Sequence, residues 1–359
     1  MGSPLGNNIV QSSSSTSTPH SAADESGAVR LQYRLCPMQE GMLFHYLRSG
    51  SDGVDIVQVV VTLREAIDAE KLNEAWARVI DRHPTLRSSF SWDGLDRPLR
   101  CVHPEVRLPW AQEDWSTLGA EQAEDRLEEF LRNDRRRGFQ LAEAPALRLL
   151  LLRFGAEHWV LVWSFHHILI DGSSSRDILQ EVFSAYASLL SGAEPSFPAR
   201  RPYHEYLDWL DRRDVGADEA FWRDLLRGFR FQTPLPGGSG SIRDEHGRLQ
   251  AAQQTRHLSI DLTSKLKAFS NQQGFTLHTV LRGAWALLLC RYTGEEEVVF
   301  GTTRSCRKTF LREDETSVGI FINTVPVRIG IDANAPLIQW LKQLRAQNMA
   351  VREHEHTAL

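Results

Sequence analysis

Two adjacent histidines offer the clearest chemistry in this sequence. His166 and His167 end an apolar segment, and Asp171 and Gly172 follow after the apolar triplet 168–170. Histidine exchanges protons near neutral pH, so His167 could act as a base. Side chains alternate between the two faces of a strand, so only one of the histidines can face a given site while the segment stays extended. We therefore expect one chemical and one structural histidine.

Asp171 and Gly172 fit either a functional or a purely local role. The aspartate could orient an imidazole, or it could pair with a distant arginine and fix the turn. The glycine would allow a sharp turn or a close approach of the backbone to a substrate. A strand end with one packed histidine and an ordinary turn explains the same residues. The motif therefore needs support from other parts of the chain.

Two weaker candidates have simpler explanations. The serines at 173–175 could offer a nucleophile, but no G-x-S-x-G turn is present, so we expect them to cap the next helix. His354 and His356 are two residues apart, which does not match the i, i+4 spacing of a helical zinc site. We expect a solvated helix end there, and no metal site in the chain.

Length, composition and charge restrict the class of protein. The 359 residues suffice for about two domains, and 42% hydrophobic with 24% charged residues is typical of a folded protein. The net charge of −5 argues against a nucleic-acid partner. No apolar stretch approaches the ~18 residues of a membrane span. The four cysteines have no C-x-x-C spacing, so we expect a reducing, cytoplasmic setting without disulfides.

Hydrophobic periodicity predicts alternating strands and helices on both sides of a proline-rich connector at 192–202. The predicted strands are 56–62, 147–153, 159–165, 254–260, 297–302 and 318–329. The predicted helices begin near Pro37 and span 69–80, 123–136, 177–190, 203–213, 218–227, 263–273, 277–291 and 336–352. We expect a flexible segment at 1–29, a first lobe at 30–191 and a second lobe at 203–359. Two such lobes can meet at a cleft, where ligands commonly bind.

With the histidine motif in place, the sequence resembles the condensation domains of nonribosomal peptide synthetases. Their HHxxxDG signature is matched in full by His166, His167, Asp171 and Gly172. Four other segments match in the family's order, namely CPMQEGMLFH from Cys36, RHPTLRSSF from Arg82, YHEYLDW from Tyr203 and VGIFINTVPVR from Val318. The resemblance extends over residues 33–359.

The resemblance implies an α/β fold with mixed sheets, arranged as a V-shaped pseudo-dimer of two chloramphenicol-acetyltransferase-like lobes with a tunnel between them. Donor and acceptor carrier domains would bring thioesters on 4′-phosphopantetheine arms. The acceptor amine would attack the donor thioester and form an amide. The domain would need no metal or cofactor of its own, would be monomeric and would neighbour an adenylation domain.

The resemblance also assigns roles to single residues. His167 would lie near the attacking amine, where it removes a proton or positions the amine. His166 would support the strand. Asp171 would be the structural partner of Arg87, and Gly172 completes the motif at the active site.

Two further residues, Ser173 and Asn323, are predicted to line the substrate tunnel. Ser173 stands where the family often has tryptophan, and Asn323 belongs to the VGIFINTVPVR segment, whose Asn-Thr pair favours a condensation over an epimerisation domain. Family members continue beyond the helix after this segment, so the resemblance implies a second lobe truncated at Leu359. A place near the start of a longer chain would suit a starter subtype, which attaches an acyl group to the first amino acid.

Two other functions remain open at this stage. A stand-alone acyltransferase that uses coenzyme A thioesters would share the histidine motif, and turnover with free acyl-CoA would favour it. A noncatalytic module that recruits carrier proteins would bind carriers without transferring an acyl group.

Overall fold

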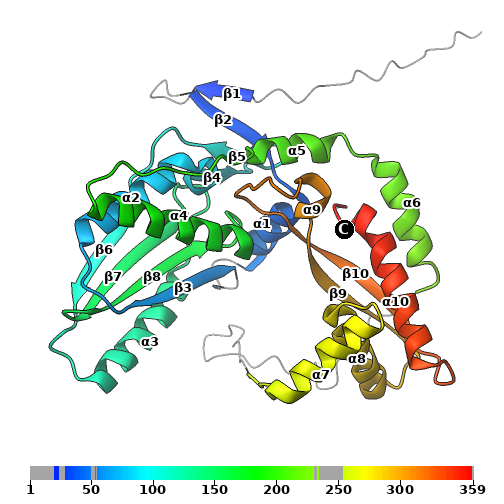
Figure 1. Ribbon diagram of the computed structural model, residues 1–359. Coiled ribbons are helices and arrows are strands. Elements are labelled where there is room, and N and C mark those ends of the chain that lie inside the picture. Colours follow the sequence, from blue (N-terminus) through cyan, green and yellow to red (C-terminus); the bar gives the residue numbers. More distant parts are fainter. Residues whose placement is uncertain are drawn as a thin grey trace, which may run out of the picture.

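The computed structural model describes residues 20–23, 29–49, 53, 55–229, 233 and 254–357. Most of the predicted flexible segment 1–29 lies outside this range, although residues 20–23 form strand β1 (His20–Ala23). Figure 1 shows two groups of elements, one from the first half of the chain (29–190) and one from the second half (203–357). This mixed α/β architecture contains several sheets, as the sequence predicted.

The sheet that carries the histidine motif lies in the first half. Its strand order is β3 (Ile56–Leu63), β8 (His158–His166), β7 (Leu147–Gly155) and β6 (Trp110–Asp114). Strand β8 is antiparallel to both β3 and β7, whereas β6 runs parallel to β7. Helices α2 (Ala69–Arg82) and α4 (Gly172–Leu190) cover one face, and α3 (Ala120–Arg137) covers the other (Figure 1).

Burial on both faces explains the uninterrupted leucine run of β7. Leu149 and Leu151 pack in one core with Trp76 of α2, whereas Leu150 and Leu152 belong to a second core beneath α3. Successive strand residues point to opposite faces, so a sheet covered on both sides needs apolar residues at every position. The histidines thus follow β8, a strand that is fixed from both sides.

A second sheet of the first half has the strand order β1, β2 (Val29–Arg34), β5 (Leu99–Val102) and β4 (Ser88–Ser91). The 3₁₀ turn η1 (Pro84–Arg87) leads into β4, and α1 (Pro37–Ser49) follows β2. These strands were not predicted, because they are short and carry polar residues at most positions.

The second half is built on the antiparallel pair β9 (Glu297–Ser305) and β10 (Ile322–Gly330). Val298, Val327 and Ile329 of this pair form a core with α8 (Leu277–Thr293) and α10 (Leu337–Val351). The helices of this half are α5 (Tyr203–Asp211), α6 (Val215–Leu225), α7 (Ile260–Gln272), α8 (Leu277–Thr293), the short α9 (Arg307–Phe310), α10 (Leu337–Val351) and the 3₁₀ turn η2 (Arg352–His354). No helix in the described part of the chain is long and apolar enough to cross a membrane.

The strand predicted at 254–260 is wrong. Residues 254–259 form no strand, and helix α7 begins at Ile260. The Ser259 side chain accepts a hydrogen bond from the Leu262 backbone N–H at 3.2 Å, which caps the helix. The cap therefore sets the start of α7 three residues before the predicted start at 263.

Candidate active site

The two histidines of the motif lie in different environments at the end of β8. His166 is the last strand residue and is buried, whereas His167 lies in the following turn and is half-buried. The ring of His166 packs edge-on against Tyr46 of α1. Strand alternation alone left open which histidine would be packed, and the family resemblance gave the supporting role to His166.

His166 is held in its neutral form. Its Nδ1 accepts a hydrogen bond from the Ile168 backbone N–H at 3.1 Å, which leaves the ring proton on Nε2. Burial lowers the pKa of His166 to about 4, and the charge of His167 contributes in the same direction. At neutral pH this ring is an uncharged structural group.

His167 is attached to the neighbouring strand through its backbone. Its N–H donates to the Asp55 carbonyl at 2.7 Å, directly beyond the register pair Ile56–His166 of β3 and β8. This bond holds the backbones of Asp55 and His167 together just beyond the end of the strand pair. Nδ1 of His167 is buried and has no hydrogen-bond partner within the described ranges.

Asp55 is a residue that the sequence analysis did not single out. Its carboxyl group is half-buried, and burial raises its pKa, while the nearby His167 and His45 act in the opposite direction. An acid that interacts electrostatically with His167 can stabilise a charged imidazole. The register of β3 against β8, which brings the two together, is not visible in the sequence.

Asp171 connects the two halves of the chain. Its carboxylate is 1% exposed and accepts hydrogen bonds from the Ser174 N–H at 2.8 Å, the Phe321 N–H at 2.9 Å and Arg307 Nη2 at 2.7 Å. The first of these bonds caps α4. We call Asp171, Arg307 and the backbone of 317–321 the Asp171 junction.

The predicted pairing of Asp171 with Arg87 is wrong, because Arg307 occupies that place. Arg87 ends η1 and donates to the backbone carbonyls of His103 and Pro104, so it holds the loop after β5. Arg307 begins α9, directly after β9, and also donates to the Ser317 carbonyl at 2.7 Å. Any support that Arg87 gives to the active site stays a prediction.

The residues after Asp171 form the first turn of α4, which starts five residues earlier than predicted. Asp171, and not a serine, is the cap, so the predicted capping role of the serines is wrong. Ser174 is buried instead, and its hydroxyl bonds to both the N–H and the carbonyl of Gly319. Gly172 is exposed and Ser173 is half-buried. Their contact with a substrate stays a prediction.

Asn323 is bonded to the end of the described chain. Its Nδ2 donates to the carbonyls of Glu355 at 2.9 Å and Thr357 at 2.8 Å. The buried amide therefore fixes residues 355–357 against β10. Its predicted place along a substrate tunnel stays a prediction.

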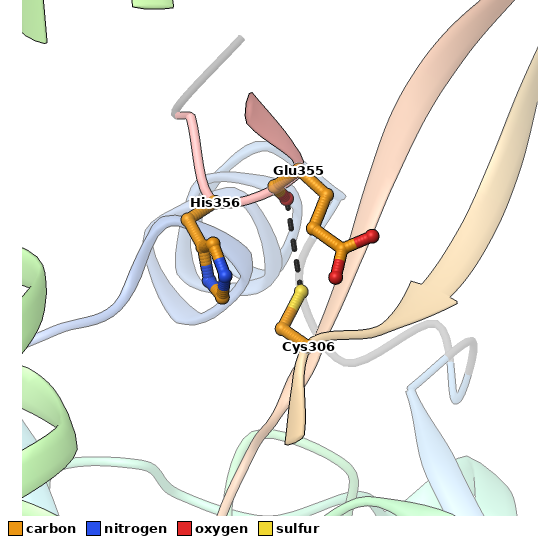
Figure 2. A group of neighbouring side chains, drawn as sticks. All are labelled: Cys306, Glu355 and His356. Carbon is orange, nitrogen blue, oxygen red and sulfur yellow. Dashed lines mark hydrogen bonds between the residues drawn. The ribbon is translucent and has the colours of Figure 1, made fainter. Parts of the chain in front are cut away.

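The predicted solvated end at 354–356 is wrong. Glu355 and His356 are 2% and 4% exposed, and His354 bonds to Asp218 at 2.7 Å. Buried beside them is Cys306, which lies 49 residues earlier in the sequence (Figure 2). Sequence spacing could not reveal this group, since a distant turn supplies its third member. We call Cys306, Glu355 and His356 the C-terminal cluster.

Comparisons with known proteins agree with this architecture. Residues 29–359 match the Condensation domain family. Over 331 residues the chain is 41% identical to a linear gramicidin synthase protein of Brevibacillus parabrevis, covering 91% of this chain and 6% of that protein. It is 38% identical over 308 residues to chondramide synthase cmdD of Chondromyces crocatus, covering 86% of this chain and 8% of the synthase. The chain thus spans a small part of each relative.

Solved structures show the same fold. The first condensation domain of the calcium-dependent antibiotic synthetase has a TM-score of 0.75 at 18% identity, covering 91% of this chain and 76% of that one. The starter condensation domain of rhizomide synthetase also has a TM-score of 0.75, at 22% identity, covering 90% and 72%. The chain therefore belongs to the condensation domains of nonribosomal peptide synthetases, which are amide-bond-forming acyltransferases.

Proposed function

We propose that this chain joins a carrier-bound acyl or peptidyl thioester to the amine of a carrier-bound aminoacyl thioester. The observation that carries the proposal is the complete HHxxxDG motif, in which His166 is buried and neutral while the half-buried His167 remains for chemistry. Both substrates would arrive on 4′-phosphopantetheine arms of partner carrier domains, with an adenylation domain as a neighbour in a longer cytoplasmic synthetase. The domain would act as a monomer within it.

In this proposal the chain accelerates the reaction mainly by positioning the two substrates, and less by activating them. A thioester is already activated, so holding it and the amine in attack geometry supplies much of the acceleration. His167 then accepts the proton that the amine loses as the C–N bond forms, and it returns this proton to the sulfur as the C–S bond breaks and the thiol leaves. Such a proton transfer adds typically about 10²- to 10⁴-fold.

Asp55 gives His167 a partner for the charge it gains. In the proposal its carboxylate, which interacts electrostatically with His167, stabilises the imidazolium formed during attack. The variant Asp55→Asn keeps the backbone carbonyl that accepts from His167 and removes only the charge. We expect it to lower kcat while the KM for the acceptor stays the same.

The test is amide formation between two carriers loaded in vitro. We expect His167→Ala to lower turnover at least about 100-fold, and His158→Ala, an exposed histidine at the other end of β8, to leave turnover unchanged. Undiminished turnover by His167→Ala would remove His167 from the mechanism. No amide from the parent chain with both loaded carriers would contradict the function itself.

The same assay separates two donor classes. A condensation domain that extends a chain would use a peptidyl donor, whereas the starter subtype predicted from the sequence would use a fatty or other acyl donor. The likeness to a starter domain is at the level of the fold and does not choose between them. Offering both donors to the same acceptor, and comparing kcat/KM, decides which class the domain uses.

A further inference from the structure

The C-terminal cluster combines the side chains that bind zinc in proteins. Cys306 lies directly after β9, whereas Glu355 and His356 follow η2, so the fold brings together two distant segments (Figure 2). One sulfur, oxygen or nitrogen atom of each residue lies within 4.8 Å of those of the other two. Ligand atoms around a tetrahedral Zn²⁺ are roughly 3.5 Å apart, so these side chains need to close in by about 1 Å.

One buried nitrogen atom of the cluster makes no hydrogen bond within the described part of the protein. His356 is 4% exposed, and its Nε2 has no hydrogen-bond partner among the described residues. A buried polar atom without a partner costs free energy, so such atoms often mark a bound ion or water. Its other nitrogen, Nδ1, lies 3.2 Å from the Tyr206 hydroxyl. If Nδ1–H donates to that oxygen, Nε2 carries the free lone pair that a metal requires.

The surroundings of Glu355 resemble the outer contacts of a metal-binding carboxylate. One oxygen accepts from Arg304 Nε at 2.5 Å, and the other accepts from the Thr309 hydroxyl at 3.2 Å. Each carboxylate oxygen has two lone pairs, so these donors leave one free on each. These contacts orient the carboxylate and leave lone pairs on it that a metal can use.

A metal here would need a deprotonated thiol and a path to the cluster. Binding would release the thiol proton of Cys306 to solvent, and the resulting thiolate would add one negative charge beside the Glu355 carboxylate, which already pairs with Arg304. His356 lines a cavity of about 210 Å³ together with Arg213 and Asp218, which offers a route for the ion. The fourth coordination position is then open to a water molecule.

We propose that Cys306, Glu355 and His356 form a Zn²⁺ site that fixes residues 355–357 against the end of β9. The site uses three protein ligands of mixed type, which is the ligand chemistry that zinc accepts. It is separate from the histidine motif, so its test does not depend on the proposed function.

The test uses Co²⁺ and Zn²⁺ alone, added to the chain after treatment with a chelator. Tetrahedral Co²⁺ bound by a thiolate shows visible absorption and a sulfur-to-metal band in the near ultraviolet. We expect both for the parent chain, with one equivalent bound and displaced by Zn²⁺. We also expect Zn²⁺ to raise the melting temperature, because it binds only the folded state.

Matched variants locate the site. Cys306→Ser should abolish the sulfur-to-metal band, and His356→Gln should weaken Co²⁺ binding at least 10-fold. The controls are Cys290→Ser, in α8, and His354→Gln, which removes a histidine from the same segment; both should bind as the parent does. Circular dichroism of the metal-free variants checks that they fold. Absence of the band in the parent chain, or its persistence in Cys306→Ser, would overturn the proposal.

Discussion

Two buried acids, Asp171 and Glu355, are held in different ways. Asp171 of the junction accepts two backbone N–H bonds in addition to Arg307, whereas Glu355 of the C-terminal cluster is held by the side chains of Arg304 and Thr309. Backbone donors cannot move without moving the chain, but side chains can change rotamer. The junction is therefore a closed structural contact, whereas the cluster can still accommodate a ligand.

Removing Asp171 should have the most severe effect on stability. Asp171→Ala leaves the guanidinium of Arg307 and two backbone N–H groups without their partner, so we expect a loss of about 3–5 kcal/mol in the free energy of unfolding. The control is Glu205→Ala, since Glu205 pairs with Arg201 on a partly exposed surface and such pairs contribute about 0–1 kcal/mol. Urea unfolding measures both. Equal losses would show that the junction is no stronger than a surface pair.

His166 adds a third kind of buried group, one that must stay neutral. Its pKa is lowered from 6.5 to about 4 in the folded protein, so the unfolded chain binds a proton more readily between these values. Stability from this group is therefore complete above pH 6.5 and decreases as the pH falls toward 4, by roughly 3 kcal/mol. We expect His166→Gln, which cannot titrate, to show a shallower decrease in urea unfolding across this range. Identical slopes would contradict the assignment.

Gly319 tests how tightly the junction is closed. A Cβ at this position would lie 2.1 Å from the Tyr203 ring, which is itself buried, so no side chain fits without displacing the tyrosine. We expect Gly319→Ala to lower the free energy of unfolding by about 1–3 kcal/mol. Gly330→Ala is the control, because nothing lies within 4 Å of its added methyl group. In thermal unfolding, Gly319→Ala should melt at a clearly lower temperature than Gly330→Ala.

Local patterns predicted the parts of the fold that local physics determines. The β-branched run of β3, the helical spacing of α2 and the paired apolar strands β7 and β8 all follow from residues close in sequence. The boundaries failed where a single capping side chain decided them, as with Ser259 before α7 and Asp171 before α4. The family resemblance gave the architecture that periodicity alone left open.

The candidate site was predictable only in part, because its members come from distant segments. The motif could be read directly, since its residues are neighbours. The partner of Asp171 could not, because the chain contains many arginines and only the fold decides that Arg307 reaches it while Arg87 holds a loop. Asp55 and Cys306 were missed for the same reason, since strand register and a distant turn bring them to their places.

The pairing of Asp171 with Arg307 also matters while the chain is being synthesised. The two residues are 136 positions apart. Because the ribosome makes the chain from its N-terminus, Asp171 is synthesised well before Arg307. At about 5–20 residues per second, the interval is roughly 7 to 27 seconds. Closing a loop of this length costs about 4 kcal/mol of chain entropy, and the contacts of Ser174 and Tyr203 with 319–320 share that cost. During this interval the Asp171 carboxylate therefore has no ion-pair partner in Arg307 and stays hydrated.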